Sequence, residues 1–132
     1  TVLRPTWQAR PQPSVFFAGQ ISGVEGYVES AASGLIAGLN AAALARGELP
    51  QAPPRTTAIG ALGHYVSHAD PTNYQPSNIA FGLIPVVEGG PRRRSERRRA
   101  VAERALLQID EWRLSLSGTS NETDANALAL LS

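Results

Sequence analysis

The chain has 132 residues, with twelve arginines, no lysine, eleven acidic residues and a formal net charge of +1. This balance excludes a chain that binds nucleic acid along its whole length as a polycation. Cysteine is absent, which excludes disulfides, cysteine-based zinc fingers and a thiol nucleophile within the chain. We see no apolar run long enough to span a bilayer and no signal peptide, and we expect a cytoplasmic protein.

The first half of the chain predicts an extended lead, a strand, a glycine turn and a helix. Prolines punctuate residues 1–13, and the apolar run at residues 15–18 predicts a short buried strand. A helix rich in small residues is predicted from Tyr27 to Ala45. Its buried face is expected to carry Leu35, Leu39, Ala42, Ala31 and Gly38. A strand that leads through glycines into a helix presents free backbone N–H groups, which suit phosphate or the oxygens of a nucleotide or flavin.

The second half predicts two helices and one strand. A helix over residues 57–68 is expected to begin at a threonine cap, to bury Ile59, Leu62 and Val66, and to end before Asp70-Pro71. A strand is predicted over residues 78–87. The last helix is predicted over residues 93–116 with an apolar stripe of Val101, Ala105, Ile109, Trp112 and Leu116, and with the ion pairs Arg92–Glu96, Arg99–Glu103 and Asp110–Arg113. We expect residues 117–126 to be loose and residues 127–131 to form a short helix or a frayed tail.

Two blocks of the sequence resemble a known family. FFAGQISGVEGYVESAASGLIAGLNAA, beginning at Phe16, and TTAIGALGHYVSHADPTNYQPSNIAFGLIP, over residues 56–85, are similar to the folate- and FAD-dependent tRNA (uracil-5-)-methyltransferases, TrmFO, which are related to GidA-type flavoproteins. The resemblance implies an α/β fold, namely the C-terminal part of a glutathione-reductase-like, Rossmann-type FAD-binding fold. It assigns residues 1–50 to the late FAD-binding domain, residues 51–91 to a proline-rich connector on the folate and substrate side, and residues 92–132 to a C-terminal helix and loose tail.

The same resemblance implies an activity and its cofactors. Enzymes of this family methylate C5 of a T-loop uridine in tRNA, using methylenetetrahydrofolate and FADH2 that is recharged from NAD(P)H. Their catalytic cysteines are absent here, so we assign no catalytic residue to this chain and expect it to be inactive without the N-terminal part of the polypeptide. Two alternatives are a GidA-type flavoprotein that modifies a wobble uridine and a non-catalytic module that binds tRNA or protein.

The glycine turn holds the predicted cofactor contacts. Its spacing does not match the GxGxxG fingerprint, so spacing alone favours an ordinary turn. The resemblance implies that the turn contacts FAD through Gly19, Gln20, Gly23, Val24, Glu25, Gly26 and Tyr27. Tyr27 either approaches the flavin or folate or packs on the core. For Glu25 and Glu29, a role at the helix start is favoured over acid–base catalysis.

The second block holds the predicted folate and substrate side, which the resemblance assigns to His64, Tyr65 and Asn78. An ordinary packed or surface role for the histidines is the alternative. His64 and His68 have the i, i+4 spacing of metal ligands, but two histidines and Asp70 are too few for zinc, and we expect no metal.

Six of the twelve arginines fall between Arg92 and Arg99. In a tRNA-modifying protein such a run would contact phosphates through Arg92, Arg93, Arg94, Arg97 and Arg98. The alternative is a solvated helix face that Glu96 partly neutralises. No aromatic residue is interleaved with the run, so the sequence gives no support for stacking on unpaired bases.

Overall fold

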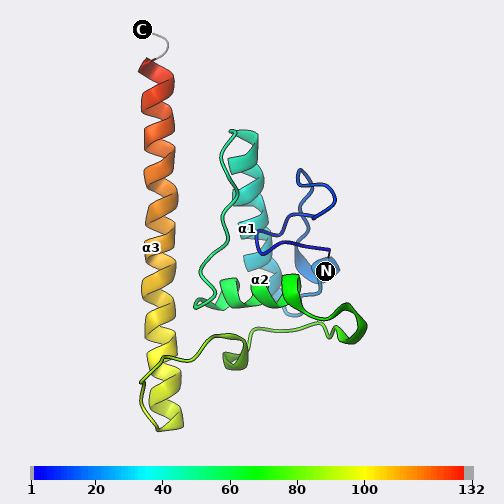
Figure 1. The fold of residues 1–132 in the computed structure, drawn as a ribbon, viewed down its shortest axis with the longest axis vertical. Helices are drawn as coiled ribbons and strands as arrows, with labels where there is room; N and C mark the ends of the chain where they lie inside the picture. The colour runs from blue at the N-terminus through cyan, green and yellow to red at the C-terminus, as the bar shows by residue number, and fades with distance from the viewer. Residues whose placement is uncertain (1, 130–132) are drawn as a thin grey trace.

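A computed structural model describes residues 2–129, and for residues 117–129 it describes the backbone alone. Residues 1 and 130–132, the outer ends of the predicted lead and tail, lie outside this range. Three α-helices and three short 3₁₀ helices follow one another along the chain. Their order is η1 (Gly19–Ser22), α1 (Tyr27–Ala45), α2 (Ala58–His68), η2 (Pro71–Asn73), η3 (Phe81–Leu83) and α3 (Arg94–Ala129). Figure 1 shows α1 and α3 upright, with α2 lying across the lower part of α1.

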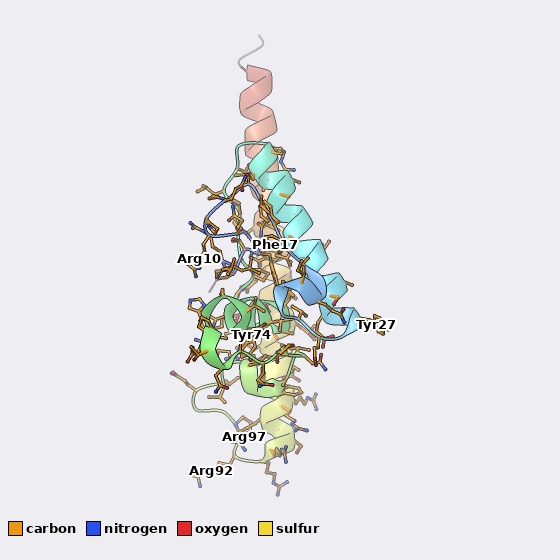
Figure 2. The ribbon with its side chains drawn as sticks, turned by 90° about the vertical axis from the view of Figure 1, so that its right-hand side faces the viewer. Arg10, Phe17, Tyr27, Tyr74, Arg92 and Arg97 are labelled. Carbon is orange, nitrogen blue, oxygen red and sulfur yellow. The ribbon has the colours of Figure 1, made fainter. Side chains whose placement is uncertain are left out.

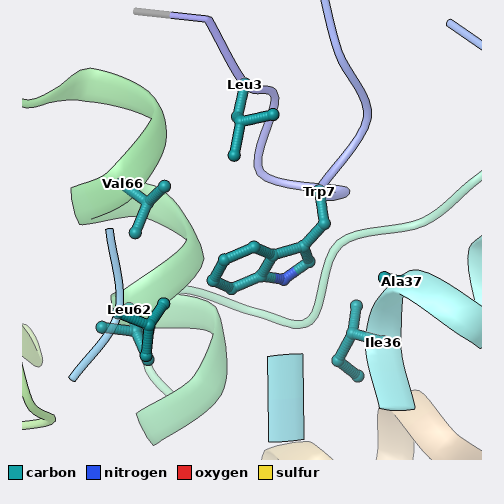
Figure 3. Packing of buried hydrophobic residues seen from close by; sticks show 7 residues of the cluster. Leu3, Trp7, Ile36, Ala37, Leu62 and Val66 are labelled. Atoms are coloured by element: carbon teal, nitrogen blue, oxygen red, sulfur yellow. The ribbon is translucent and has the colours of Figure 1, made fainter. Parts of the chain in front are cut away.

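The main core forms around Trp7, which is only 1% exposed. Its indole lies between α2, which contributes Leu62 and Val66, and α1, which contributes Ile36 (Figure 3). The Trp7 backbone has φ of 68°, a left-handed conformation that costs a residue with a side chain about 1–2 kcal/mol. Burial of a large aromatic side chain is worth at least as much, so packing offsets the strain.

Helix α1 has the predicted bounds, but the predicted buried face is wrong. Leu35 is 64% exposed and Leu39 is also exposed, whereas the buried residues are Ser33, Ile36, Ala37 and Asn40. The buried polar groups explain the difference. Ser33 Oγ accepts a hydrogen bond from the Gly19 N–H, and Asn40 bonds both the N-terminal lead and the connector after α1. Because these bonds compensate the burial of polar atoms, they orient the helix against its apolar pattern.

By length and composition alone, α1 could cross a membrane, with a mean hydropathy of 1.3 over its apolar window. This corrects the expectation that no run is long enough. The signal is weak because the core helix of a soluble protein passes the same test. The hydrogen bonds of Ser33 and Asn40 to the rest of the chain favour a helix that packs against protein on that side.

Neither predicted strand is seen, since residues 2–129 contain only isolated bridges. Phe16 forms one antiparallel bridge with Gln8, and η3 occupies the middle of residues 78–87. A strand requires a neighbour along its length, and among the described residues no neighbour extends beyond one bridge. The α/β class is therefore not seen in this structure, which is mainly helical.

Helix α2 begins where the threonine cap predicts. Thr57 is the N-cap, and its hydroxyl accepts a hydrogen bond from Gly60 N–H at 3.1 Å. A Cβ at Gly60 would overlap the carbonyl oxygens of Pro53 and Pro54, so glycine allows the proline-rich connector to lie against the helix. The predicted burial of Leu62 and Val66 is confirmed.

Helix α3 is longer than predicted. It begins at Arg94 and continues through the predicted loose segment to Ala129, because nothing in residues 117–129 breaks a helix: the stretch has no proline and a single glycine. The predicted apolar stripe faces the rest of the chain, with Val101 buried and Trp112 partly buried against the main core. Among the ion pairs, Arg99–Glu103 and Asp110–Arg113 are confirmed. Glu96, however, pairs with Arg93 rather than with Arg92.

Candidate cofactor turn and arginine cluster

The glycine turn needs glycine for its backbone conformation. Gly19, Gly23 and Gly26 have φ of 69°, 89° and 92°, a region that residues with a Cβ rarely adopt. Gly19 is the first residue of η1, and Gly26 is the N-cap of α1. The turn therefore reverses the chain from the extended Ala18 into the start of α1 within eight residues.

A segment about fifty residues later holds this turn. The Tyr74 hydroxyl donates a 2.6 Å hydrogen bond to the carbonyl oxygen of Gly23. Val24 and Ser77 form a parallel bridge, in which Glu25 N–H donates to the Ser77 carbonyl at 3.0 Å. Burial, and secondarily Tyr65, raise the pKa of Tyr74, so its hydroxyl keeps the donating proton at neutral pH. We call residues 19–26, together with residues 74–79, the clamped turn.

The N-terminus of α1 offers unused donors beside this turn. Within the described residues, the N–H groups of Tyr27, Val28 and Glu29 make no hydrogen bond. Tyr27 is 97% exposed and projects from the end of α1 (Figure 2), so the alternative in which it packs on the core is wrong. The Glu29 carboxylate turns back toward Gly26 and accepts a hydrogen bond from Ile79 N–H at 3.2 Å. The carboxylate therefore holds a later segment against the start of α1, whereas the expected role was to cap the N–H groups of the helix itself.

A largely apolar cavity of about 460 Å³ lies on another side of the same turn. It joins the N-terminal lead to the C-terminal end of α2 and to Tyr74. Its lining residues are Val2, Leu3, Phe17, Ile21, Ser22, Gly23, Val66, Ala69, Pro71 and Tyr74. Of the seven predicted flavin contacts, only Gly23 lines this cavity.

The three residues predicted for the folate side are not brought together. The Asn78 side-chain oxygen lies within 3.2 Å of where a Gly26 Cβ would stand, so Asn78 is part of the clamped turn. Tyr65 contacts the clamped turn through a 2.8 Å hydrogen bond from its hydroxyl to the Gln75 carbonyl and a ring contact with Tyr74. His64 instead stacks on His68 with ring centroids 4.1 Å apart. Burial, then the charges of Arg55 and His68, lower the pKa of His64.

No group of three or more potential metal ligands occurs among the side chains that the structure describes. The stacked histidines and Asp70 do not converge: Asp70 instead accepts hydrogen bonds from the backbone and hydroxyl of Thr72. Those bonds lower the pKa of the Asp70 carboxyl.

The arginine run lies around the start of α3. Its six arginines, at positions 92–94 and 97–99, are all exposed to solvent. Arg92 and Arg97 lie at the lower end of the molecule in Figure 2. A second cavity, of about 280 Å³, opens beside them and is lined in part by Arg94, Arg97 and Arg98.

Comparison with known proteins agrees with the two blocks. Residues 1–49 match the family model for glucose inhibited division protein A. A protein from Pelotomaculum thermopropionicum named methylenetetrahydrofolate–tRNA-(uracil-5-)-methyltransferase TrmFO is 56% identical over 115 residues, which is 87% of this chain and 26% of the relative. Relatives of the same name from Symbiobacterium thermophilum and Geobacter sulfurreducens are 55% and 50% identical over 84% and 85% of this chain, and 25% and 26% of their own lengths.

Over most of its length the chain is similar to a segment of the TrmFO relatives, and over residues 1–49 it is similar to GidA. The predicted resemblance is thus confirmed. The chain spans about a quarter of the length of the TrmFO relatives that it matches. The GidA match reaches residue 49 and so includes the first block, while the similarity to the TrmFO relatives extends over more than four fifths of the chain.

Sequence reasoning missed two residues of this TrmFO-type segment. Tyr74 holds the glycine turn through its hydrogen bond to Gly23, and the Phe81 ring lies under the Arg98 guanidinium. The only available signal was that both are aromatic residues in a stretch rich in proline and asparagine. Such a stretch is expected to be a loop that contributes little to a core, so an aromatic residue there suggests a specific contact.

Proposed function

We propose that this chain forms part of a flavin-dependent tRNA methyltransferase that methylates C5 of a T-loop uridine. Methylenetetrahydrofolate would donate the one-carbon unit, and NAD(P)H would reduce the flavin. The observation that carries the proposal is the 50–56% identity to relatives named as methylenetetrahydrofolate–tRNA-(uracil-5-)-methyltransferases. Its partners would be tRNA and the remaining, N-terminal part of the polypeptide, and its location the cytoplasm.

The clamped turn is the place where FAD would be held. Three free N–H donors at the start of α1 suit the acceptor edge of a flavin, and the left-handed Gly26 keeps a side chain away from that edge. Exposed Gln20, which precedes the start of α1 in the sequence, would bond the ribityl chain of FAD. Gly19, Val24 and Glu25 would form the surrounding backbone. Bound FAD would supply the electrons that reduce the transferred one-carbon unit.

The folate and substrate side would lie around exposed Tyr27 and Asn78, which flank the start of α1 from two different segments. Tyr65 would act through Tyr74 by holding residues 74–79 against the turn. One face of the His64 ring is covered by His68, so His64 would contact the substrate only through its other face. In the complete fold, the extended residues 15–18 would join the Rossmann-type sheet, since Ala18 already has extended backbone angles.

The test is made on the whole polypeptide that carries this chain. Purified protein should be yellow, and tRNA incubated with it, methylenetetrahydrofolate and NADPH should contain 5-methyluridine in the T loop, measured by nucleoside mass spectrometry. Modification of the wobble uridine instead would favour the GidA-type alternative, which the match over residues 1–49 supports. A colourless protein that binds tRNA without changing it would favour a non-catalytic module.

A further inference from the structure

The arginines around the start of α3 fall into two sets with different surroundings. Arg93 pairs with Glu96 at 3.9 Å and Arg99 pairs with Glu103 at 2.8 Å. Arg94, Arg97 and Arg98 form no ion pair with any described carboxylate. These three share one helix face with Val101, because their positions follow the spacing i, i+3, i+4 and i+7.

Segment η3 places an aromatic ring against the unpaired set. The Arg98 guanidinium carbon lies 5.5 Å from the centroid of the Phe81 ring, and Phe81 is 49% exposed. Both residues line the cavity of about 280 Å³, and buried Ile84 and Val101 form part of its apolar lining. The aromatic residue that the arginine run lacks in sequence is therefore supplied from another segment.

This combination selects a chemical class of ligand. A half-exposed ring and a guanidinium plane both offer flat surfaces on which a base can stack. Three uncompensated cations around the same cavity attract more than one phosphate, which favours a polynucleotide over a single nucleotide. A base inside a duplex cannot present its face to Phe81, because its neighbours cover both faces.

We propose that Phe81, Arg94, Arg97 and Arg98 form a pocket for an unpaired nucleotide of RNA, whose base stacks on Phe81 and whose flanking phosphates meet the three arginines. The proposal rests on the proposed function in one respect, namely that RNA is the substrate. It adds a binding site for an unpaired nucleotide outside the clamped turn and separates the arginines that bind RNA from those that pair with glutamate.

The experiment measures binding of a ten-nucleotide single-stranded RNA that contains one 2-aminopurine, with a duplex of the same length as comparison. The whole polypeptide is used as wild type and as Phe81→Leu, Phe81→Tyr and Arg98→Gln variants. Arg93→Gln is the matched control, since it removes an ion-paired arginine from the same arginine run. Thermal melting checks that each variant is folded.

The wild type should quench 2-aminopurine and prefer the single strand. Phe81→Leu should weaken single-strand binding about 5-fold or more and abolish the quenching, while Phe81→Tyr retains both. Arg98→Gln should reduce the log–log salt slope by about 0.7, and Arg93→Gln should reduce it less. Since Phe81→Leu removes no charge, it should leave the slope unchanged.

Equal affinity for duplex, unchanged binding by both Phe81→Leu and Arg98→Gln, or full competition by uridine monophosphate at the concentration of the RNA would each overturn the pocket. Failure of the two proposals is distinguishable. A wild-type protein that shows Phe81-dependent RNA binding but forms no 5-methyluridine contradicts the proposed methylation alone. Normal methylation with no effect of Phe81 on RNA binding contradicts the pocket alone.

Discussion

The hydroxyl of Tyr74 and the carbonyl oxygen of Gly23 are joined by a 2.6 Å hydrogen bond, although 51 residues separate them in sequence. A Cβ at Gly23 would overlap this hydroxyl, and the Gly23 backbone is itself left-handed. The tyrosine and the absence of a side chain therefore act together, since the close approach requires both.

Substitutions at Tyr74 and at Gly23 should both destabilise the clamped turn, but by different amounts of unfolding free energy. Tyr74→Phe should lower the free energy of unfolding by about 1 kcal/mol through the lost hydrogen bond. Gly23→Ala should cost more, about 2 kcal/mol or above, because it adds a steric overlap to an unfavourable φ. Gly34→Ala is the control: the helical Gly34 has open space around it, and alanine should raise stability by about 0.5–1 kcal/mol. Urea unfolding of the three variants checks the order, and equal losses for the two glycine substitutions would contradict it.

Gly26→Val should release FAD from the whole protein. Valine is β-branched and fits poorly at φ of 92°, and its side chain would displace the Glu29 carboxylate from the start of α1. The flavin-to-protein absorbance ratio of the purified variant gives the measurement, with Gly38→Ala on the same helix as control. Normal flavin content in Gly26→Val would show that this turn does not hold the cofactor.

Asn40→Ala should be among the most destabilising changes in α1. The Asn40 amide donates to the carbonyls of Thr6 and Gln51, and its oxygen accepts from Gln51 N–H at 2.7 Å, all with the side chain 4% exposed. Alanine leaves these backbone groups without a partner, at a cost of about 2–4 kcal/mol. Asn40→Asp should be no better, since a carboxylate would face two carbonyl oxygens. A melting temperature of Asn40→Ala within 1 °C of the wild type, roughly a tenth of the expected shift, would refute this role.

Two tryptophans should differ in their contribution. Trp7→Ala should cost about 3–5 kcal/mol, as expected for a fully buried indole. Trp112→Ala should cost less, because Trp112 is only partly buried against the core. Arg113→Ala, on the exposed side of α3, should change stability by about 0.5 kcal/mol or less. Thermal unfolding ranks the three, and a larger loss for Trp112 than for Trp7 would mean that α3 carries the core.

The stability of the protein should fall as the pH drops below about 7. The pKa of His64 is lowered from 6.5 by burial, so the unfolded chain binds the proton more readily than the folded chain. Stability is therefore full above the unfolded pKa of 6.5 and declines as the pH falls through the interval down to the lowered folded pKa. His64→Gln should flatten this decline in denaturant unfolding between pH 7.5 and 5. An equally steep decline in the variant would assign the effect to another group.

Local signals predicted the starts of the helices well and the contacts poorly. The bounds of α1 and the Thr57 cap of α2 follow from glycines, threonines and periodicity within a few residues. The buried face of α1 was missed because the polar Ser33 and Asn40 are buried through hydrogen bonds to segments that lie outside the helix. The predicted strands are not seen because four apolar residues indicate burial but do not supply a neighbouring strand.

The candidate site shows the same division. The left-handed glycines of the turn could be anticipated from their spacing at a helix start, and their φ values agree. Tyr74 and Phe81 could not be anticipated, because their partners Gly23 and Arg98 lie 51 and 17 residues away and no local pattern links them. Periodicity in the sequence indicates which side chains share one face of a helix, whereas contacts between loops depend on the packed fold.

The solvent-facing side of α1 has a practical consequence. Val28, Leu35 and Leu39 are all exposed on a helix that offers no charge between Glu29 and Arg46. Exposed apolar surface of this kind lowers solubility and promotes self-association. Produced by itself, the chain should precipitate or form oligomers as its concentration rises, and mild detergent or a solubilising fusion partner should delay this. Biophysical work on the isolated chain therefore needs low protein concentrations.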